Sequence, residues 1–114
     1  MDFDLDIGAW IGDYSDPQTF IDMFVTDGGN NHTGWGDPQY DQMLATSENT
    51  ADPAARMKIL SDMEKILCGD QVPIVPIYFW VGMALYYPDK VGGFAPNFVD
   101  DHRWGNLFIP GKTP

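Results

Sequence analysis

Apolar and acidic residues alternate at the beginning of the chain. The acidic positions are Asp2, Asp4 and Asp6, and the apolar positions between them are Phe3, Leu5 and Ile7. A period of two places successive side chains on opposite faces of a strand. We therefore predict a strand over residues 2–7 with one buried face. The spacing does not predict a calcium loop, because an EF-hand requires Gly directly after its third ligand and Ile7 stands there.

Apolar residues recur at helical spacing after each of three Asp-Pro pairs, which are Asp16-Pro17, Asp37-Pro38 and Asp52-Pro53. An Asp can cap a helix N-terminus, and Pro suits the first helical position, where no helical partner is needed for an N–H. The spacing predicts one apolar stripe on each helix. The stripes are Phe20, Ile21, Phe24 and Val25; Tyr40, Met43 and Leu44; and Met57, Leu60, Met63, Ile66 and Leu67.

The longest helix is predicted from Pro53 to about Leu67, packed against a strand around residues 74–78. Apolar residues 72–80 predict that strand, with its prolines at an edge, and residues 81–87 predict a second strand. Residues 26–36 are rich in Gly and Asn, so we expect an ordered loop between the first two helices. This order of strand, three helices and two strands predicts an α/β fold and not a helical bundle.

Charge narrows the range of partners. Acidic residues outnumber basic ones by 17 to 6, and the net charge is -11. Such a chain repels phosphate backbones and anionic lipid surfaces, so we expect no nucleic-acid partner, whereas a cationic ligand group would be attracted. Cys68 follows the apolar face of the long helix, which favours a buried, unreactive thiol.

An enzyme would need a catalytic constellation, and the candidates are Asp13 and Asp16 with His32 or His102. No metal-ligand spacing, nucleophile elbow or phosphate-binding loop accompanies them. Both histidines are explained more simply as surface or capping groups. We therefore expect no catalysis, no metal and no cofactor.

Five runs of residues, taken in order, carry a family resemblance that covers nearly the whole chain. They are Gly8-Ala9-Trp10-Ile11-Gly12-Asp13-Tyr14-Ser15-Asp16-Pro17-Gln18-Thr19-Phe20, Gly29-Asn30-Asn31-His32-Thr33-Gly34-Trp35, Asp37-Pro38-Gln39-Tyr40-Asp41, Val72-Pro73-Ile74-Val75-Pro76-Ile77-Tyr78-Phe79-Trp80 and Val91-Gly92-Gly93-Phe94. Arg56, Glu64 and Trp104 extend the match. The sequence resembles the extracellular solute-binding protein family 5, the peptide- and oligopeptide-binding subunits of bacterial ABC importers.

The resemblance implies an α/β fold, namely the C-terminal part of a periplasmic-binding-protein type II-like two-lobed clamp with a mixed sheet and flanking helices. Residues 1–87 would complete one ligand-binding lobe, and residues 88–114 would be a tail that crosses to the other, missing lobe. The implied function is the capture of extracytoplasmic peptides for import, with the membrane permease subunits of the transporter as partners. The implied location is periplasmic or extracytoplasmic. The signal peptide, and a lipid anchor where there is one, would lie in the full-length protein.

Family resemblance also implies three ligand-binding residues. In peptide-binding members, the Asp of the Gly-Trp-x-x-Asp-Tyr run holds the N-terminal ammonium of the peptide. Asp13 occupies that place, although Ala9 stands where Gly is usual. Trp10 would wall the same pocket, and Trp80 would face the ligand from the last strand of the lobe. Ile7 stands where some members carry a basic residue for the C-terminal carboxylate of the ligand.

Two alternatives remain at this stage. From the residues alone, Asp13 can be a turn or cap residue, and a Trp in a strand is more often part of the core. The family also includes relatives that bind a non-peptide solute, such as a metal chelate or an oligosaccharide, and the chain can belong to that group.

Overall fold

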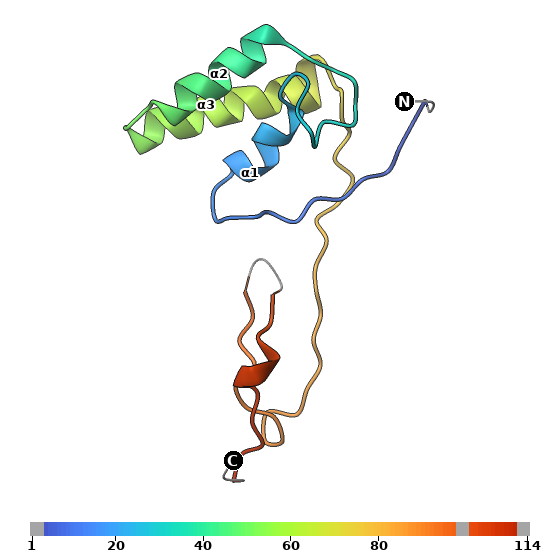
Figure 1. The fold of residues 1–114 in the computed structure, drawn as a ribbon, viewed down its shortest axis with the longest axis vertical. Helices are drawn as coiled ribbons and strands as arrows, with labels where there is room; N and C mark the ends of the chain where they lie inside the picture. The colour runs from blue at the N-terminus through green and yellow to red at the C-terminus, as the bar shows by residue number, and fades with distance from the viewer. Residues whose placement is uncertain (1–3, 98–100, 112–114) are drawn as a thin grey trace. The chain divides into compact units, whose positions relative to one another are not determined.

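The computed structural model describes residues 4–97 and 101–111. Contacts divide the chain into two units, Met1–Ile77 and Tyr78–Pro114. The two units are described separately, because their relative placement is not determined (Figure 1).

Short helices make up the first unit. They are α1 (Gln18–Ile21), the 3-10 turn η1 (Asp22–Phe24), α2 (Pro38–Glu48), α3 (Pro53–Lys65) and the π-helical turn η2 (Ile66–Asp70). Helices α2 and α3 run side by side as an antiparallel pair, and α1 packs against α3 (Figure 1). The pair is consistent with the short connection between the two helices, residues 49–52.

Both caps predicted for the long helices are confirmed. An oxygen of Asp37 accepts a hydrogen bond from the backbone N–H of Gln39 at 2.8 Å, and an oxygen of Asp52 accepts one from Ala55 at 2.8 Å. A proline occupies the first helical position in each case. The Asp16-Pro17 pair differs from the other two. Pro17 is the N-cap of α1, which begins at Gln18, contains only four residues and has no side-chain cap hydrogen bond. The predicted first helix is therefore correct in place but much shorter than its apolar stripe.

The core of the first unit lies between these helices. Its buried apolar residues are Ile21, Tyr40, Leu44, Leu60, Met63 and Leu67. The hydroxyl of Tyr40 donates to the carbonyl oxygen of Ile21 at 2.6 Å, so a fully buried polar group ties α2 to α1. The stripe predicted for the last helix is correct at Leu60, Met63 and Leu67, all of which are buried.

Two expectations about α3 are wrong. Met57 was expected on its buried face, but 48% of it is exposed. The partner of this helix is α2, with Tyr40 and Leu44, and not a strand at residues 74–78, of which only Ile74 packs against the core. The helical hairpin supplies enough apolar surface for α3, so no sheet is needed to cover it. Cys68 is also exposed and not buried, because the adjacent Leu67 takes the core position.

Strands are absent from the described part of the first unit and from residues 78–87. The predicted strand at residues 2–7 is not formed over residues 4–7, where Leu5 is 93% exposed and Ile7 is 87% exposed; Phe3 lies outside the described residues. Residues 74–87 have no regular secondary structure and are likewise unpaired, and Val72, with φ of 52°, is not extended. A strand is stable only when a neighbour pairs its N–H and C=O groups, and the described residues of this chain offer none. The predicted mixed sheet is therefore not formed by these residues themselves.

A Gly- and Asn-rich loop joins η1 to α2, as expected. Asn31 organises it, because its side-chain nitrogen donates to the carbonyl oxygens of Val25 at 3.0 Å and Trp35 at 2.8 Å. Trp35 in turn packs edge-on against Tyr40, with ring centroids 5.1 Å apart. The loop is thus fastened to the helical core.

The second unit folds back on itself at an isolated antiparallel bridge between Gly92 and Phe108. Each of these two residues donates its N–H to the carbonyl oxygen of the other, at 2.8 and 3.0 Å. Gly93 has φ of 82°, and a side chain there would collide with the backbone of Asn106, so only glycine fits. The 3-10 turn η3 (Trp104–Asn106) precedes the returning segment. None of the described helices is both long enough and apolar enough to span a membrane.

Candidate functional site

The candidate site begins with the segment that carries Trp10 and Asp13, just before α1. The backbone N–H of Asp13 donates to the hydroxyl oxygen of Thr19 at 3.0 Å, and Thr19 is buried. The side chain of Asp13 is exposed. The backbone is therefore fastened to the core while the carboxylate faces solvent, an arrangement that allows it to meet a ligand.

Gly12 is buried against the same helix. A Cβ atom at this position would lie 3.0 Å from Cγ2 of Thr19 and 3.2 Å from Cζ of Phe20. Glycine suits this close approach, because a Cβ atom would require Thr19 or Phe20 to shift.

Trp10 is half-buried. Its indole N–H is buried and has no hydrogen-bond partner among the residues that the structure describes. A buried unpaired donor costs free energy until an acceptor reaches it. Trp10 and Asp13 thus offer one donor and one carboxylate within a single segment.

Polar contacts join the turn after Asp13 to both long helices. Arg56 on α3 donates to the two carboxylate oxygens of Asp16, at 2.7 and 3.0 Å, and to Oε1 of Gln18 at 2.8 Å. The side-chain nitrogen of Gln18 donates to Glu48 on α2 at 3.0 Å. Hydrogen bonds from Arg56 hold the pKa of Asp16 below its ordinary value. Asp16 is therefore charged and engaged in the fold.

Tyr14 points back to the helices. Its hydroxyl donates to Asp22 at 2.7 Å, and this hydrogen bond raises the pKa of Tyr14 to about 12. The phenol is neutral near pH 7 and acts as a fixed donor to Asp22.

Trp80 belongs to the second unit, whose placement relative to Trp10 and Asp13 is not determined. It is 77% exposed, and its ring centroid lies 6.2 Å from that of Tyr78. Residues 78–87 have no pairing partner among the described residues, so the strand from which Trp80 was expected to face a ligand is not formed by this chain itself.

Of the residues of the enzyme alternative, Asp16 and His32 lie in the first unit and His102 lies in the second. Asp16 is held by Arg56, His32 is exposed in the loop, and His102 packs on Phe94 in the second unit with centroids 4.4 Å apart. Within residues 4–97 and 101–111, no three His, Cys, Asp or Glu side chains are grouped to hold a metal ion.

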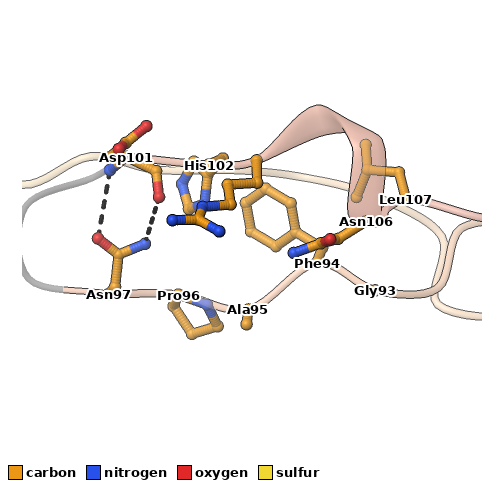
Figure 2. A pocket seen from close by; sticks show the side chains of 10 residues that line it. Gly93, Phe94, Ala95, Pro96, Asn97, Asp101, His102, Asn106 and Leu107 are labelled. Atoms are coloured by element: carbon orange, nitrogen blue, oxygen red, sulfur yellow. Dashed lines mark hydrogen bonds between the residues drawn. The ribbon is translucent and has the colours of Figure 1, made fainter.

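A shallow depression of about 240 Å³ lies in the second unit (Figure 2). Its lining comes from residues 93–97, 101–103 and 106–107. Two residues of this lining are hydrogen-bonded to each other: the side chain of Asn97 donates to the carbonyl oxygen of Asp101 at 2.8 Å and accepts from the N–H of Asp101 at 3.2 Å (Figure 2). None of Trp10, Asp13 and Trp80 lines it.

Sequence reasoning missed Thr19 and Arg56 as parts of the site. Thr19 belongs to the run that carries the family resemblance, but no local pattern marks it as the partner of the backbone N–H of Asp13. Arg56 did give a signal, since it is one of only three basic residues up to Ile77, the others being Lys58 and Lys65. A lone Arg facing many carboxylates is a candidate for a structural ion pair.

Comparison with known proteins gives a consistent result, although no family model matches the chain. The oligopeptide-binding protein OppA of Bacillus subtilis is 36% identical over 97% of this chain and 18% of its own length. The dipeptide-binding protein DppE of the same organism is 32% identical over 93% of this chain and 20% of its own length. The probable deoxycholate-binding periplasmic protein YgiS of Escherichia coli is 30% identical over 95% of this chain and 20% of its own length.

The chain therefore spans about a fifth of the length of these relatives. The similarity extends over nearly every residue of the chain, including the candidate site, and several of the matching proteins are named for binding peptides. By this similarity, the chain belongs to the extracellular solute-binding protein family 5.

Proposed function

We propose that this chain is one segment of the substrate-binding component of an ABC importer, and that this component captures extracytoplasmic peptides. The observation that carries the proposal is the similarity over almost the whole chain to oligopeptide- and dipeptide-binding proteins. On this proposal the protein is a binding protein and not an enzyme, acts in the periplasm or outside the cytoplasmic membrane, and delivers its ligand to permease subunits.

The proposal also accounts for the unpaired extended segments. Residues 1–87 complete one lobe of a two-lobed clamp, and residues 88–114 cross to the other lobe. Residues 2–7 and 72–87 become strands of a mixed sheet whose remaining strands lie elsewhere in the complete protein. The high exposure of Leu5, Ile7 and Phe79 in this chain supports the idea, because apolar side chains at such positions are normally covered.

At the site, Asp13 pairs with the α-ammonium of the peptide, with Trp10 and Trp80 as aromatic walls. A cleft that closes over an ammonium must supply a countercharge, because an unpaired buried charge is very costly. The exposed carboxylate of Asp13 on an anchored backbone is suited to this role. An aromatic wall adds apolar area and a cation–π attraction.

A second candidate is a non-peptide ligand, and the similarity to a probable deoxycholate-binding protein favours it. Deoxycholate is an anion, so Asp13 would repel it where it would attract a peptide ammonium. The sign of the ligand charge next to Asp13 therefore separates the two candidates.

The test is a cycle of two variants and two ligands in the complete binding protein. Asp13→Asn keeps the shape of the side chain and removes its charge, so the affinity for a peptide with a free N-terminus should fall roughly hundredfold or more. Acetylating the peptide's N-terminus should weaken binding to the native protein by a similar factor and to the variant hardly at all. Calorimetry measures the four affinities.

Asp4→Asn is the matched control, since Asp4 is an exposed carboxylate of the same segment. It should leave both affinities unchanged. Equal binding of free and acetylated peptide by the native protein would show that Asp13 does not hold an ammonium. Binding of deoxycholate in preference to either peptide would favour the second candidate.

A further inference from the structure

We propose that Arg56 is a positioning residue for the ligand-binding segment: by gripping Asp16 it fixes the turn that carries Asp13. The inference deepens the proposed function and rests on it where ligand affinity is concerned. On this proposal Arg56 does not itself touch the ligand; it acts through its two hydrogen bonds to Asp16, with a third to Gln18 in the same turn.

The grip is a two-point contact. Arg56 lies in the first turns of α3, 40 residues after Asp16, and its two terminal nitrogens reach the two oxygens of that carboxylate at 2.7 and 3.0 Å. The side chains of Arg56 and Asp16 are 23% and 33% exposed. A planar guanidinium matches a carboxylate at two points and so fixes its orientation as well as its distance.

A series of hydrogen bonds links Asp16 to Asp13, so that fixing one restrains the other. The N–H of Asp16 donates to the carbonyl oxygen of Tyr14 at 2.9 Å, and the N–H of Thr19 donates to the carbonyl oxygen of Asp16 at 3.2 Å. Thr19 then accepts from the N–H of Asp13 through its side chain. Asp13 to Thr19 therefore form one closed turn, and Arg56 holds the middle of that turn to α3.

The other basic residues of this unit cannot substitute for Arg56. Lys58 pairs with Asp62 one helical turn away, and Lys65 pairs with Asp70 at the end of η2. Among the ion pairs of the described residues, only Arg56–Asp16 joins segments far apart in the sequence. Loss of Arg56 would leave Asp16 in a turn that also carries the negative charge of Asp13.

Hydrogen exchange followed by mass spectrometry tests the positioning without any ligand. In the complete binding protein, Arg56→Lys keeps the charge but loses the planar fork, and Arg56→Gln loses both. Either variant should speed exchange in the segment 10–19 by roughly tenfold, the range of coupling within one hydrogen-bond network, and leave the segment 57–65 unchanged. Lys58→Gln, in the same helix, should change neither segment.

Three outcomes would overturn the inference in this arm. The first is unchanged exchange in the segment 10–19 in folded Arg56→Gln protein. The second is an equal increase in both segments, which would show a loss of overall stability and not of position. The third is an equal effect of Lys58→Gln. Because Arg56→Lys retains the charge and the aliphatic stem, it remains informative if Arg56→Gln fails to fold.

Ligand selectivity gives the second arm. In Arg56→Lys, the ratio of affinities for free and N-acetylated peptide should fall by roughly tenfold, because the carboxylate of Asp13 is no longer held in place. If the native protein binds the two peptides equally well, the proposed role of Asp13 is wrong. The hydrogen-exchange experiment still tests Arg56 in that case. If the native protein does discriminate and the affinity ratio is unchanged in Arg56→Lys, Arg56 forms a purely structural ion pair and does not position Asp13.

Discussion

Asp16 is the residue whose protonation should affect the fold most directly. Its pKa is lowered by hydrogen bonds from Arg56 and from the N–H of Gln18, relative to an ordinary value of 3.8. A carboxyl with a lower pKa in the folded state stabilises the fold above the unfolded pKa, and that contribution is lost as the pH falls through the folded pKa. Acid should therefore weaken the attachment of the turn to α3.

The corresponding prediction compares the native chain with Asp16→Asn by urea unfolding at about pH 6 and about pH 3. The native chain should be more stable than the variant at the higher pH, and the difference should shrink at the lower pH. An unchanged difference would mean that the charge of Asp16 contributes nothing to the fold. Asp62→Asn, which removes a carboxylate of the exposed pair with Lys58, is the control and should show little difference at either pH.

At the scale of single residues, the sequence predicted what is local. Asp37 and Asp52 cap helices by contacts two or three residues away, so their role could be predicted from the adjacent prolines. The partner of Arg56 lies 40 residues away, and no local pattern specifies it. The anchoring of Asp13 by Thr19 likewise depends on how the turn closes, which the sequence does not reveal.

Among the elements, α3 depends on a narrow buried face. Leu60 is 2% exposed and belongs to the core between α1, α2 and α3, whereas Met57, one turn earlier, is 48% exposed. Leu60→Ala should lower the free energy of unfolding by about 2–5 kcal/mol, as for other buried leucines. Met57→Ala should cost much less. Urea unfolding followed by circular dichroism measures both, and equal costs would mean that the face is misassigned.

A strained residue, Val72, lies just after η2 and its C-cap Gln71. Val72 has φ of 52°, although a β-branched side chain disfavours the left-handed region, and its N–H donates to the carbonyl oxygen of Ile66 at 3.4 Å. This is the position after a helix where Gly or Asn is usual. Val72→Asn should raise the free energy of unfolding by about 1 kcal/mol. Val75→Asn, at an exposed position outside the helix end, should not; a loss of stability in Val72→Asn would argue against strain.

The helices were predicted more accurately than the strands for a physical reason. A helix pairs its backbone within itself, so periodicity and caps suffice to predict α2 and α3. A strand pairs with another segment, and an alternating pattern does not say whether that segment is present. Residues 5–7 and 74–87, which were predicted as strands, have no regular secondary structure, because their pairing partners are not found among the described residues.

For the whole molecule, the main feature is the amount of uncovered apolar surface. Between residues 75 and 87 most large apolar side chains are exposed, with Phe79 at 97% and Leu85 at 93%. Patches beyond a few hundred Å² are uncommon on soluble monomers. The isolated chain should therefore bind a hydrophobic dye or aggregate, and the complete binding protein should do neither. A reversible melt of monomeric chain without dye binding would contradict this.

The same exposed stretch has a consequence for proteolysis. Tyr78, Phe79 and Trp80 follow one another in an unpaired, extended backbone, the form in which a chain fits a protease cleft. A protease with a hydrophobic pocket for large side chains can cut there without unfolding anything, whereas Tyr40 lies fully buried in the helical core. Cleavage would release the helical unit largely intact. Resistance to cleavage at Tyr78–Trp80 would thus indicate that the extended segments are paired with neighbouring strands.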